Sequence, residues 1–144
     1  MPKILLSVNP GHVRNIFNGS KLFEFRRVVC RRPPSALVIY ATAPEGAVAG
    51  EAAVEEVVTG DVDKVWSLAG RGAGISHESY LAYYAGKKTA VAFRLGKITK
   101  YPEPLTLADL GLARPPRSFV YLPEPSFGPD VPSEAKKKPP EPGA

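Results

Sequence analysis

Short apolar runs separated by turn residues alternate along the first 122 residues of the chain. Runs of this kind, bounded by glycine, proline and asparagine, are typical of strands. We therefore expect five or six strands, within residues 4–8, 21–29, 36–41, 47–58, 89–98 and 118–122. The run Ala36–Ala41 is apolar on both faces, which predicts a central strand. Gly50 interrupts a longer run and predicts a bulge or a close approach of two backbones.

Apolar residues at helical spacing predict three short helices between these strands. Asn9, Asp61 and Ser76 are the expected caps at their N-termini. The faces expected to be buried are Val13, Ile16 and Phe17, then Val62, Val65, Trp66 and Ala69, then Tyr80, Leu81 and Tyr84. Tyr83 is expected to be exposed, and residues 107–110 to form a helical turn. Short strands interrupted by helices favour a mainly β, α+β fold, a small β-barrel of five to six strands decorated by short helices.

Length and composition place this fold in one domain, expected to span residues 1–122. A chain of 144 residues with 44% hydrophobic residues is long enough for a single core. Residues 123–144 hold seven prolines and almost no apolar pattern, which predicts a disordered tail. No apolar run approaches the roughly 20 residues of a membrane span, and the N-terminus lacks a signal-peptide pattern. We therefore expect a cytoplasmic protein that binds no membrane.

The chain is basic, with a formal net charge of +5 at pH 7. Positive charge favours a polyanionic partner, and nucleic acid is the first to consider. The only cysteine, Cys30, excludes an internal disulfide and fits a reducing compartment, and its arginine neighbours could lower the pKa of its thiol. Two histidines and one cysteine, far apart in the sequence, do not make a metal site, and no cofactor is expected.

The segment Gly19–Arg26 places Lys21, Glu24 and Arg26 in an otherwise apolar strand. Burying a charge is costly unless it is paired or faces water. Strand alternation puts Glu24 and Arg26 on one face, and Lys21 reaches that face only from an irregular strand start. The cluster is therefore either an ion-pair network that closes the barrel or the floor of a polar binding site. In a binding site the cations can hold phosphate, while the carboxylate accepts a hydrogen bond from an amino or hydroxyl group.

The pattern Gly19-x-Lys21-x-x-Glu24-x-Arg26 after a short helix resembles the GxKxxExR signature of the ASCH domain, a family of the PUA-like superfamily. The resemblance covers most of residues 3–121 and implies a PUA-like β-barrel whose signature lines a cleft, with a role in RNA binding or processing. Some members resemble amidohydrolases that deacetylate N4-acetylcytidine with a threonine three residues after the lysine. Glu24 stands at that position without a hydroxyl to acylate, which disfavours this reaction. Other members resemble ribonucleases.

The resulting hypothesis is an RNA- or nucleotide-binding protein that takes a base or nucleoside into a charged cleft. The expected ligand-binding residues are Lys21, Glu24, Arg26, Arg27, Arg31 and Arg32, with the arginines outside the cleft on phosphates. Those outer arginines equally fit a solvated strand edge. RNA is the expected partner and DNA the alternative. The alternative function is a ribonuclease or a hydrolase of a modified nucleoside, with Lys21 and Glu24 as catalytic residues. His12 and His77 are expected to be solvated.

Overall fold

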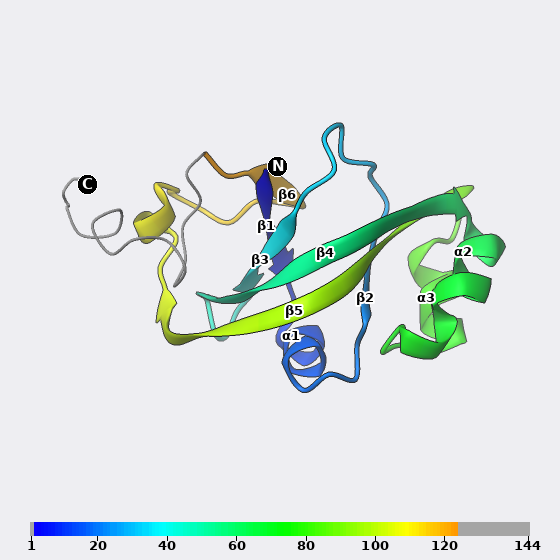
Figure 1. Cartoon of the computed structure of the whole chain (residues 1–144), viewed down its shortest axis with the longest axis horizontal. Helices are drawn as coiled ribbons and strands as arrows, with labels where there is room; N and C mark the ends of the chain where they lie inside the picture. The colour runs from blue at the N-terminus through cyan, green and yellow to red at the C-terminus, as the bar shows by residue number, and fades with distance from the viewer. Residues whose placement is uncertain (1, 124–144) are drawn as a thin grey trace.

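Six strands form one mixed sheet in the part of the chain that the computed structural model describes, residues 2–123. The strands are β1 (Lys3–Val8), β2 (Phe23–Arg26), β3 (Ala36–Ala41), β4 (Ala47–Asp61), β5 (Thr89–Leu105) and β6 (Phe119–Tyr121). Their order in the sheet is β2-β5-β4-β3-β1-β6, and only the β1–β3 pair is parallel among these strands (Figure 1). The helices are α1 (Pro10–Phe17), α2 (Val62–Ala69) and α3 (His77–Tyr83), with 3-10 turns at Gly70–Gly72 and Ala108–Leu110.

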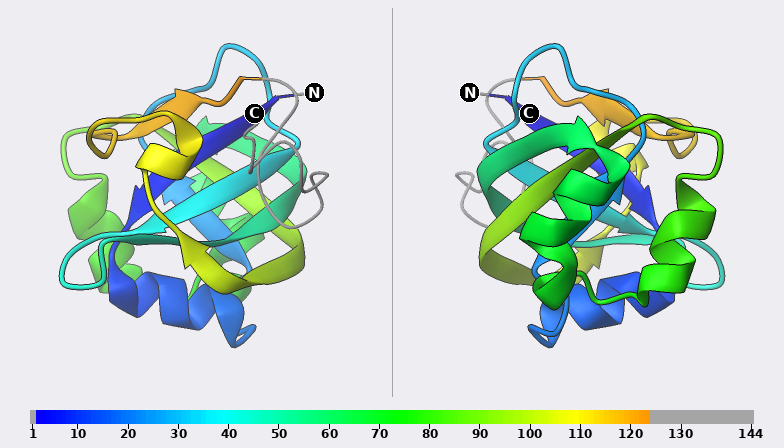
Figure 2. Two further views of the ribbon diagram at one scale, coloured as in Figure 1. Left: turned by 90° about the vertical axis from the view of Figure 1, so that its left-hand side faces the viewer. Right: turned by 90° about the vertical axis from the view of Figure 1, so that its right-hand side faces the viewer.

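The sheet curls around the main core, so that the strands enclose it from several sides (Figure 2). Alternate residues of β1 point to opposite faces: Leu6 lies in this core, whereas Leu5 belongs to a separate apolar cluster on the other face. Helix α1 crosses one end of the curled sheet and adds Ile16 to the main core (Figure 2). Helices α2 and α3 lie together at one end of β4 and β5, where Tyr80 anchors a third cluster (Figure 1).

This architecture confirms the predicted barrel-like, mainly β fold with short helices. The expected helix caps are also present, because the side chains of Asn9, Asp61 and Ser76 each accept a hydrogen bond from the backbone N–H three residues later. The expected close approach at Gly50 is confirmed as well. A Cβ there would collide with the backbone oxygen of Thr99, and the register between β4 and β5 shifts at this point.

Three strands, β2, β4 and β5, differ in length from the prediction by three or more residues. Strand β4 ends at Asp61, whereas the predicted strand ends at residue 58. The second strand is only Phe23–Arg26. The carbonyl of Leu22 still accepts from the N–H of Leu95 in β5, but the N–H of Leu22 donates to the carbonyl of Gly72. Strand β5 is longer than expected and continues through Pro102 and Pro104. Strand β2 pairs with β5 only as far as Arg94, so the prolines, which lack an N–H, interrupt no hydrogen bond to β2.

The helix faces also need one correction. Tyr80 and Tyr84 are buried as expected, but Leu81 is 41% exposed. Tyr83, expected in solvent, is partly buried, and its hydroxyl donates to the carbonyl of Phe25 at 3.3 Å. Helix α3 therefore turns its tyrosine side, and not Leu81, toward the sheet.

The predicted tail, residues 123–144, lies outside the described residues apart from its first position. Within residues 2–123, no helix is long and apolar enough to cross a membrane.

Candidate functional site

A cavity of about 360 Å³ opens where β1 ends, between α1, the start of β2, and α3. It is lined by Ser7, Val8, Asn9, His12, Lys21, Glu24, Phe25, Arg26, Ile75, Ser79 and Tyr83. Its size falls within the roughly 300–1,000 Å³ typical of small-molecule pockets. The position follows from the topology: β2 and β1 are not paired in the sheet, so the curled sheet leaves a seam between them.

Glu24 points to the inner side of the sheet at this seam. It lies opposite Phe93 of β5, a residue of the main core, and cross-strand partners share a face. The Nε and Nη2 atoms of Arg26 donate to Glu24 Oε2 at 3.1 and 2.9 Å. The same Nη2 donates to the carbonyl of Ser7 at 2.8 Å. Arg26 thus pairs the buried carboxylate and also joins β2 to the end of β1, where no strand pairing does so.

The second oxygen of Glu24 is unsatisfied. Glu24 Oε1 is buried and accepts no hydrogen bond from another residue, and Lys21 Nζ is 3.9 Å from it. Among the described residues it is the only buried side-chain oxygen or nitrogen without a hydrogen-bond partner. Leaving a buried acceptor without a hydrogen bond costs about 1–3 kcal/mol, and more when the acceptor is charged. A group that donates a hydrogen bond at this wall of the cavity would recover that free energy.

Lys21 reaches the cavity from the irregular stretch before β2, as predicted. Only 2% of its side chain is exposed, and its Nζ donates to the carbonyl of Ala73 at 2.8 Å. The ammonium also lies 5.2 Å from the centre of the Phe25 ring. Burial lowers the pKa of Lys21, Glu24 opposes this shift, and Arg26 adds to it. The structure therefore brings Lys21, Glu24 and Arg26 together, while their part in ligand binding stays a prediction.

His12 was expected to be solvated, but it lies at the cavity. It is partly buried in the first turn of α1 and lines the cavity. Burial lowers the pKa of His12, and the charge of Lys21 lowers it further. The imidazole is therefore mainly neutral at pH 7, with a nitrogen lone pair that can accept a proton. The other histidine, His77, is exposed and stacks on Trp66 with 4.8 Å between ring centres.

The outer arginines do not form one group. Arg27 is exposed beside the cavity, where its guanidinium lies 4.1 Å from the centre of the Tyr83 ring. Arg32 instead stacks on Tyr121, at 4.4 Å, and Tyr121 pairs with Ile4 near the beginning of β1. That is three residues, or about 10 Å along a strand, from the cavity wall.

The loop before β6 also borders the cavity. The hydroxyl of Ser7 donates to the carbonyl of Pro116 at 2.7 Å, so the loop before β6 passes beside the cavity and places the exposed Arg117 there. No sequence pattern had singled out this arginine.

Cys30 is buried in the main core, and burial raises the pKa of its thiol even though Arg26 opposes the shift. The lowering of this pKa that the arginine neighbours could produce is therefore outweighed by burial.

The chain is similar to the ASCH domain-containing ribonuclease of Zymomonas mobilis, with 37% identity over 123 residues and 82% of each protein covered. The chain belongs to the ASCH domain family. The resemblance seen in the Gly19–Arg26 signature is thereby confirmed. A lower similarity, 29% over 120 residues, links the chain to 39% of the large ribosomal subunit protein uL22 of Ureaplasma parvum. No protein-family model matches the chain.

Solved structures of the family agree with the fold. The crystal structure of ASCH from Zymomonas mobilis matches with a TM-score of 0.77 and 33% identity, over 85% of this chain and 88% of that one. A tyrosine-to-phenylalanine variant of the same protein matches with a TM-score of 0.77 and 32% identity, over 85% of this chain and 91% of that one.

Proposed function

We propose that this ASCH protein binds RNA and takes the base or nucleoside of one nucleotide into the cavity at Lys21, Glu24 and Arg26. The observation that carries the proposal is Glu24 Oε1, a buried carboxylate oxygen at the cavity wall that accepts no hydrogen bond. An amino group of a nucleobase, or a ribose hydroxyl, is a donor of the kind this oxygen lacks. The ribonuclease name of the Zymomonas relative favours RNA as the source of that donor.

The other walls offer complementary chemistry. The Lys21 ammonium has donors beyond the one that it gives to Ala73, and these suit a base carbonyl or a phosphate oxygen. Tyr83 offers part of an aromatic ring, held by Arg27 on one side, against which an unpaired base can pack. A cavity with both donors and acceptors beside an aromatic ring fits a nucleobase better than it fits a simple anion.

Phosphates of the same RNA strand would lie outside the cavity. Among the outer arginines, Arg27 lies beside the cavity. Arg32, with Arg31 next to it in the sequence, would meet the strand farther along, at the beginning of β1. Arg117 adds a charge beside Ser7. Contacts of this type hold the strand in place without reading its sequence. They weaken as the salt concentration rises, because the release of counterions from the RNA is then less favourable.

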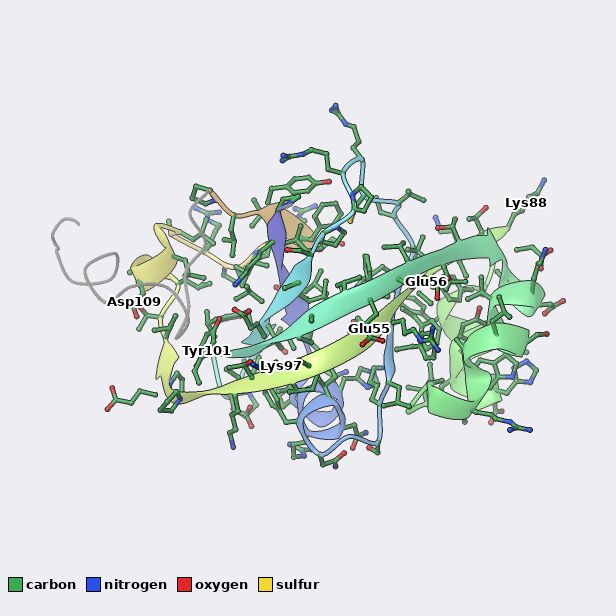
Figure 3. All side chains as sticks on the ribbon, in the orientation of Figure 1. Glu55, Glu56, Lys88, Lys97, Tyr101 and Asp109 are labelled. Atoms are coloured by element: carbon green, nitrogen blue, oxygen red, sulfur yellow. The ribbon has the colours of Figure 1, made fainter. Side chains whose placement is uncertain are left out.

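The test is the affinity for a short fluorescein-labelled single-stranded RNA, measured by anisotropy with native protein, Lys21→Met and Lys97→Met. Lys97 is exposed on β5, does not line the cavity, and lies toward the Tyr101 end of that strand (Figure 3). Both variants lose one positive charge. Because hydrogen bonds to ions contribute about 1.5–3 kcal/mol, Lys21→Met should weaken binding about ten- to a hundredfold, and Lys97→Met by much less. Equal losses in the two variants would contradict binding in the cavity. The same sequence made as DNA tests the choice of RNA.

Cleavage of RNA is the second candidate, and the observation that favours it is His12. Its neutral imidazole faces the same cavity as Lys21. It can take the proton of an attacking ribose 2′-hydroxyl, while the Lys21 ammonium stabilises negative charge on the phosphate oxygens. The 2′-oxygen bonds to the adjacent phosphorus while the P–O5′ bond breaks, so the expected products are a 2′,3′-cyclic phosphate and a 5′-hydroxyl that takes its proton from water. His12→Ala should abolish cleavage and His77→Ala should not, and equal cleavage by the His12 variant would exclude this mechanism.

A further inference from the structure

The glycine-containing turn between α2 and α3 holds Lys21 at both ends of its side chain. At the far end, the carbonyl of Ala73 accepts a hydrogen bond from Lys21 Nζ at 2.8 Å. At the near end, Gly74 lies against the first carbons of the same side chain. Beside them the N–H of Leu22 donates to the carbonyl of Gly72 at 2.7 Å, which fixes the turn to the backbone before β2.

Gly74 leaves no room for a side chain of its own. A Cβ at this position would lie 2.6 Å from Lys21 Cβ and 2.7 Å from Lys21 Cγ. These atoms are at the base of the lysine, so they cannot move aside by a simple rotation of the side-chain end. The Lys21 Cα, at 3.0 Å, leaves no space behind them either. A residue with a Cβ at 74 would therefore push the whole of Lys21 away from the turn.

We propose that Gly74 is a positioning residue, whose missing side chain lets Lys21 lie along the turn with its ammonium at the cavity wall, 3.9 Å from Glu24 Oε1. The inference rests on the proposed function, in which that ammonium contacts the nucleotide. It assigns part of the site to a residue that does not line the cavity. A larger residue at position 74 would remove the cation from the cavity while leaving Lys21 in the sequence.

Gly86 provides a matched control. Both glycines have a left-handed backbone, with φ of +70° at Gly74 and +79° at Gly86, but a Cβ at Gly86 would meet nothing within 4 Å. Gly74→Ala and Gly86→Ala therefore introduce a similar backbone strain, and only the first collides with Lys21. Gly74→Asn is a second variant, since asparagine tolerates this backbone conformation better than alanine and still carries the Cβ.

Two measurements test the proposal. In the free protein, NMR titration of ¹⁵N-labelled lysine side chains should show the pKa of Lys21 below 10.5 in native protein and Gly86→Ala, and closer to 10.5 in both Gly74 variants, because the ammonium is no longer buried. In the anisotropy assay, both Gly74 variants should lose about ten- to a hundredfold in RNA affinity, as Lys21→Met does, while Gly86→Ala stays close to native.

The two readouts separate this inference from the proposed function. If native protein binds no RNA, the proposed function fails, and the pKa of Lys21 in the Gly74 variants still decides whether Gly74 positions the lysine. An unchanged Lys21 pKa in folded Gly74→Ala would overturn the inference. So would an equal loss of RNA affinity in Gly86→Ala, or a native affinity in Gly74→Asn, because either result would assign the effect to backbone strain.

Discussion

Replacing Arg26 by alanine is expected to destabilise the fold strongly, because the buried carboxylate of Glu24 would lose the cation that pairs with it. Glu24 would keep its position on the inner side of the sheet, where its side chain is 6% exposed. It would lose both hydrogen bonds from Arg26, and the carbonyl of Ser7 would lose its donor. The remaining cation, Lys21, is 3.9 Å from the other carboxylate oxygen and gives it no hydrogen bond.

The expected loss of unfolding free energy can be compared with the loss on breaking an exposed ion pair of the same sheet. Removing one partner of a buried ion pair costs about 3–5 kcal/mol, and the lower end applies here because the cavity admits water. Arg94 and Glu56 are 3.2 Å apart, against 2.9 Å for Arg26 and Glu24, but their side chains are 54% and 57% exposed. A pair of this kind contributes about 0–1 kcal/mol. Arg94→Ala should therefore cost at least 2 kcal/mol less than Arg26→Ala, on the order of the difference between buried and exposed pairs.

Urea unfolding followed by tryptophan fluorescence measures both losses, since Trp66 packs on Tyr80 in the α2–α3 cluster. Glu24→Gln combined with Arg26→Ala should recover part of the stability, because the glutamine amide is uncharged and needs no cation beside it. If Arg26→Ala and Arg94→Ala lose the same free energy of unfolding, Glu24 is not a buried charge that depends on Arg26. The double variant would then show no recovery either.

Three further predictions follow from other parts of the molecule. Burial raises the pKa of Tyr80 to about 12, whereas a tyrosine in the unfolded chain has a pKa near 10. The contribution of Tyr80 to stability is therefore complete below pH 10 and is lost as the pH rises toward 12. The urea midpoint of the native protein should fall above pH 10, and the midpoint of Tyr80→Phe should fall less steeply. The pKa of His12, measured by NMR, should lie below 6.5 in the free protein and rise when bound RNA places its negative charge beside the cavity; no change on saturation would place the RNA elsewhere. Gly50→Ala should destabilise the fold by about 1–3 kcal/mol, because its Cβ would meet the backbone of Thr99 and the ring of Phe17. A variant as stable as the native protein would contradict this prediction, since it would show that Thr99 and Phe17 can move apart at little cost.

Local patterns predicted the features that depend on neighbouring residues. The alternation of β2 placed Glu24 and Arg26 on one face, and both side chains meet at the cavity. The caps at Asn9, Asp61 and Ser76 follow from hydrogen bonds within one helical turn. Such features need no knowledge of the rest of the fold.

Features that depend on distant contacts were missed. His12 lines the cavity because α1 crosses the end of the curled sheet, and nothing within the helix sequence specifies that crossing. Arg27 and Arg32 are five positions apart, yet each stacks on a different tyrosine, Tyr83 or Tyr121, which the sheet topology separates. Strand β5 continues through Pro102 because β2 pairs with only its first part, a property of the partner strand.

The most direct test of nucleotide binding in the cavity is a map of backbone amide and side-chain chemical shifts during titration with a short single-stranded RNA. We predict that the largest changes occur at Asn9, His12, Lys21 and Glu24, around the seam between β1 and β2. The same changes should need about ten- to a hundredfold more RNA in Lys21→Met and should stay close to native in Lys97→Met. Changes confined to the outer arginines, with none at Lys21 or Glu24, would contradict the account.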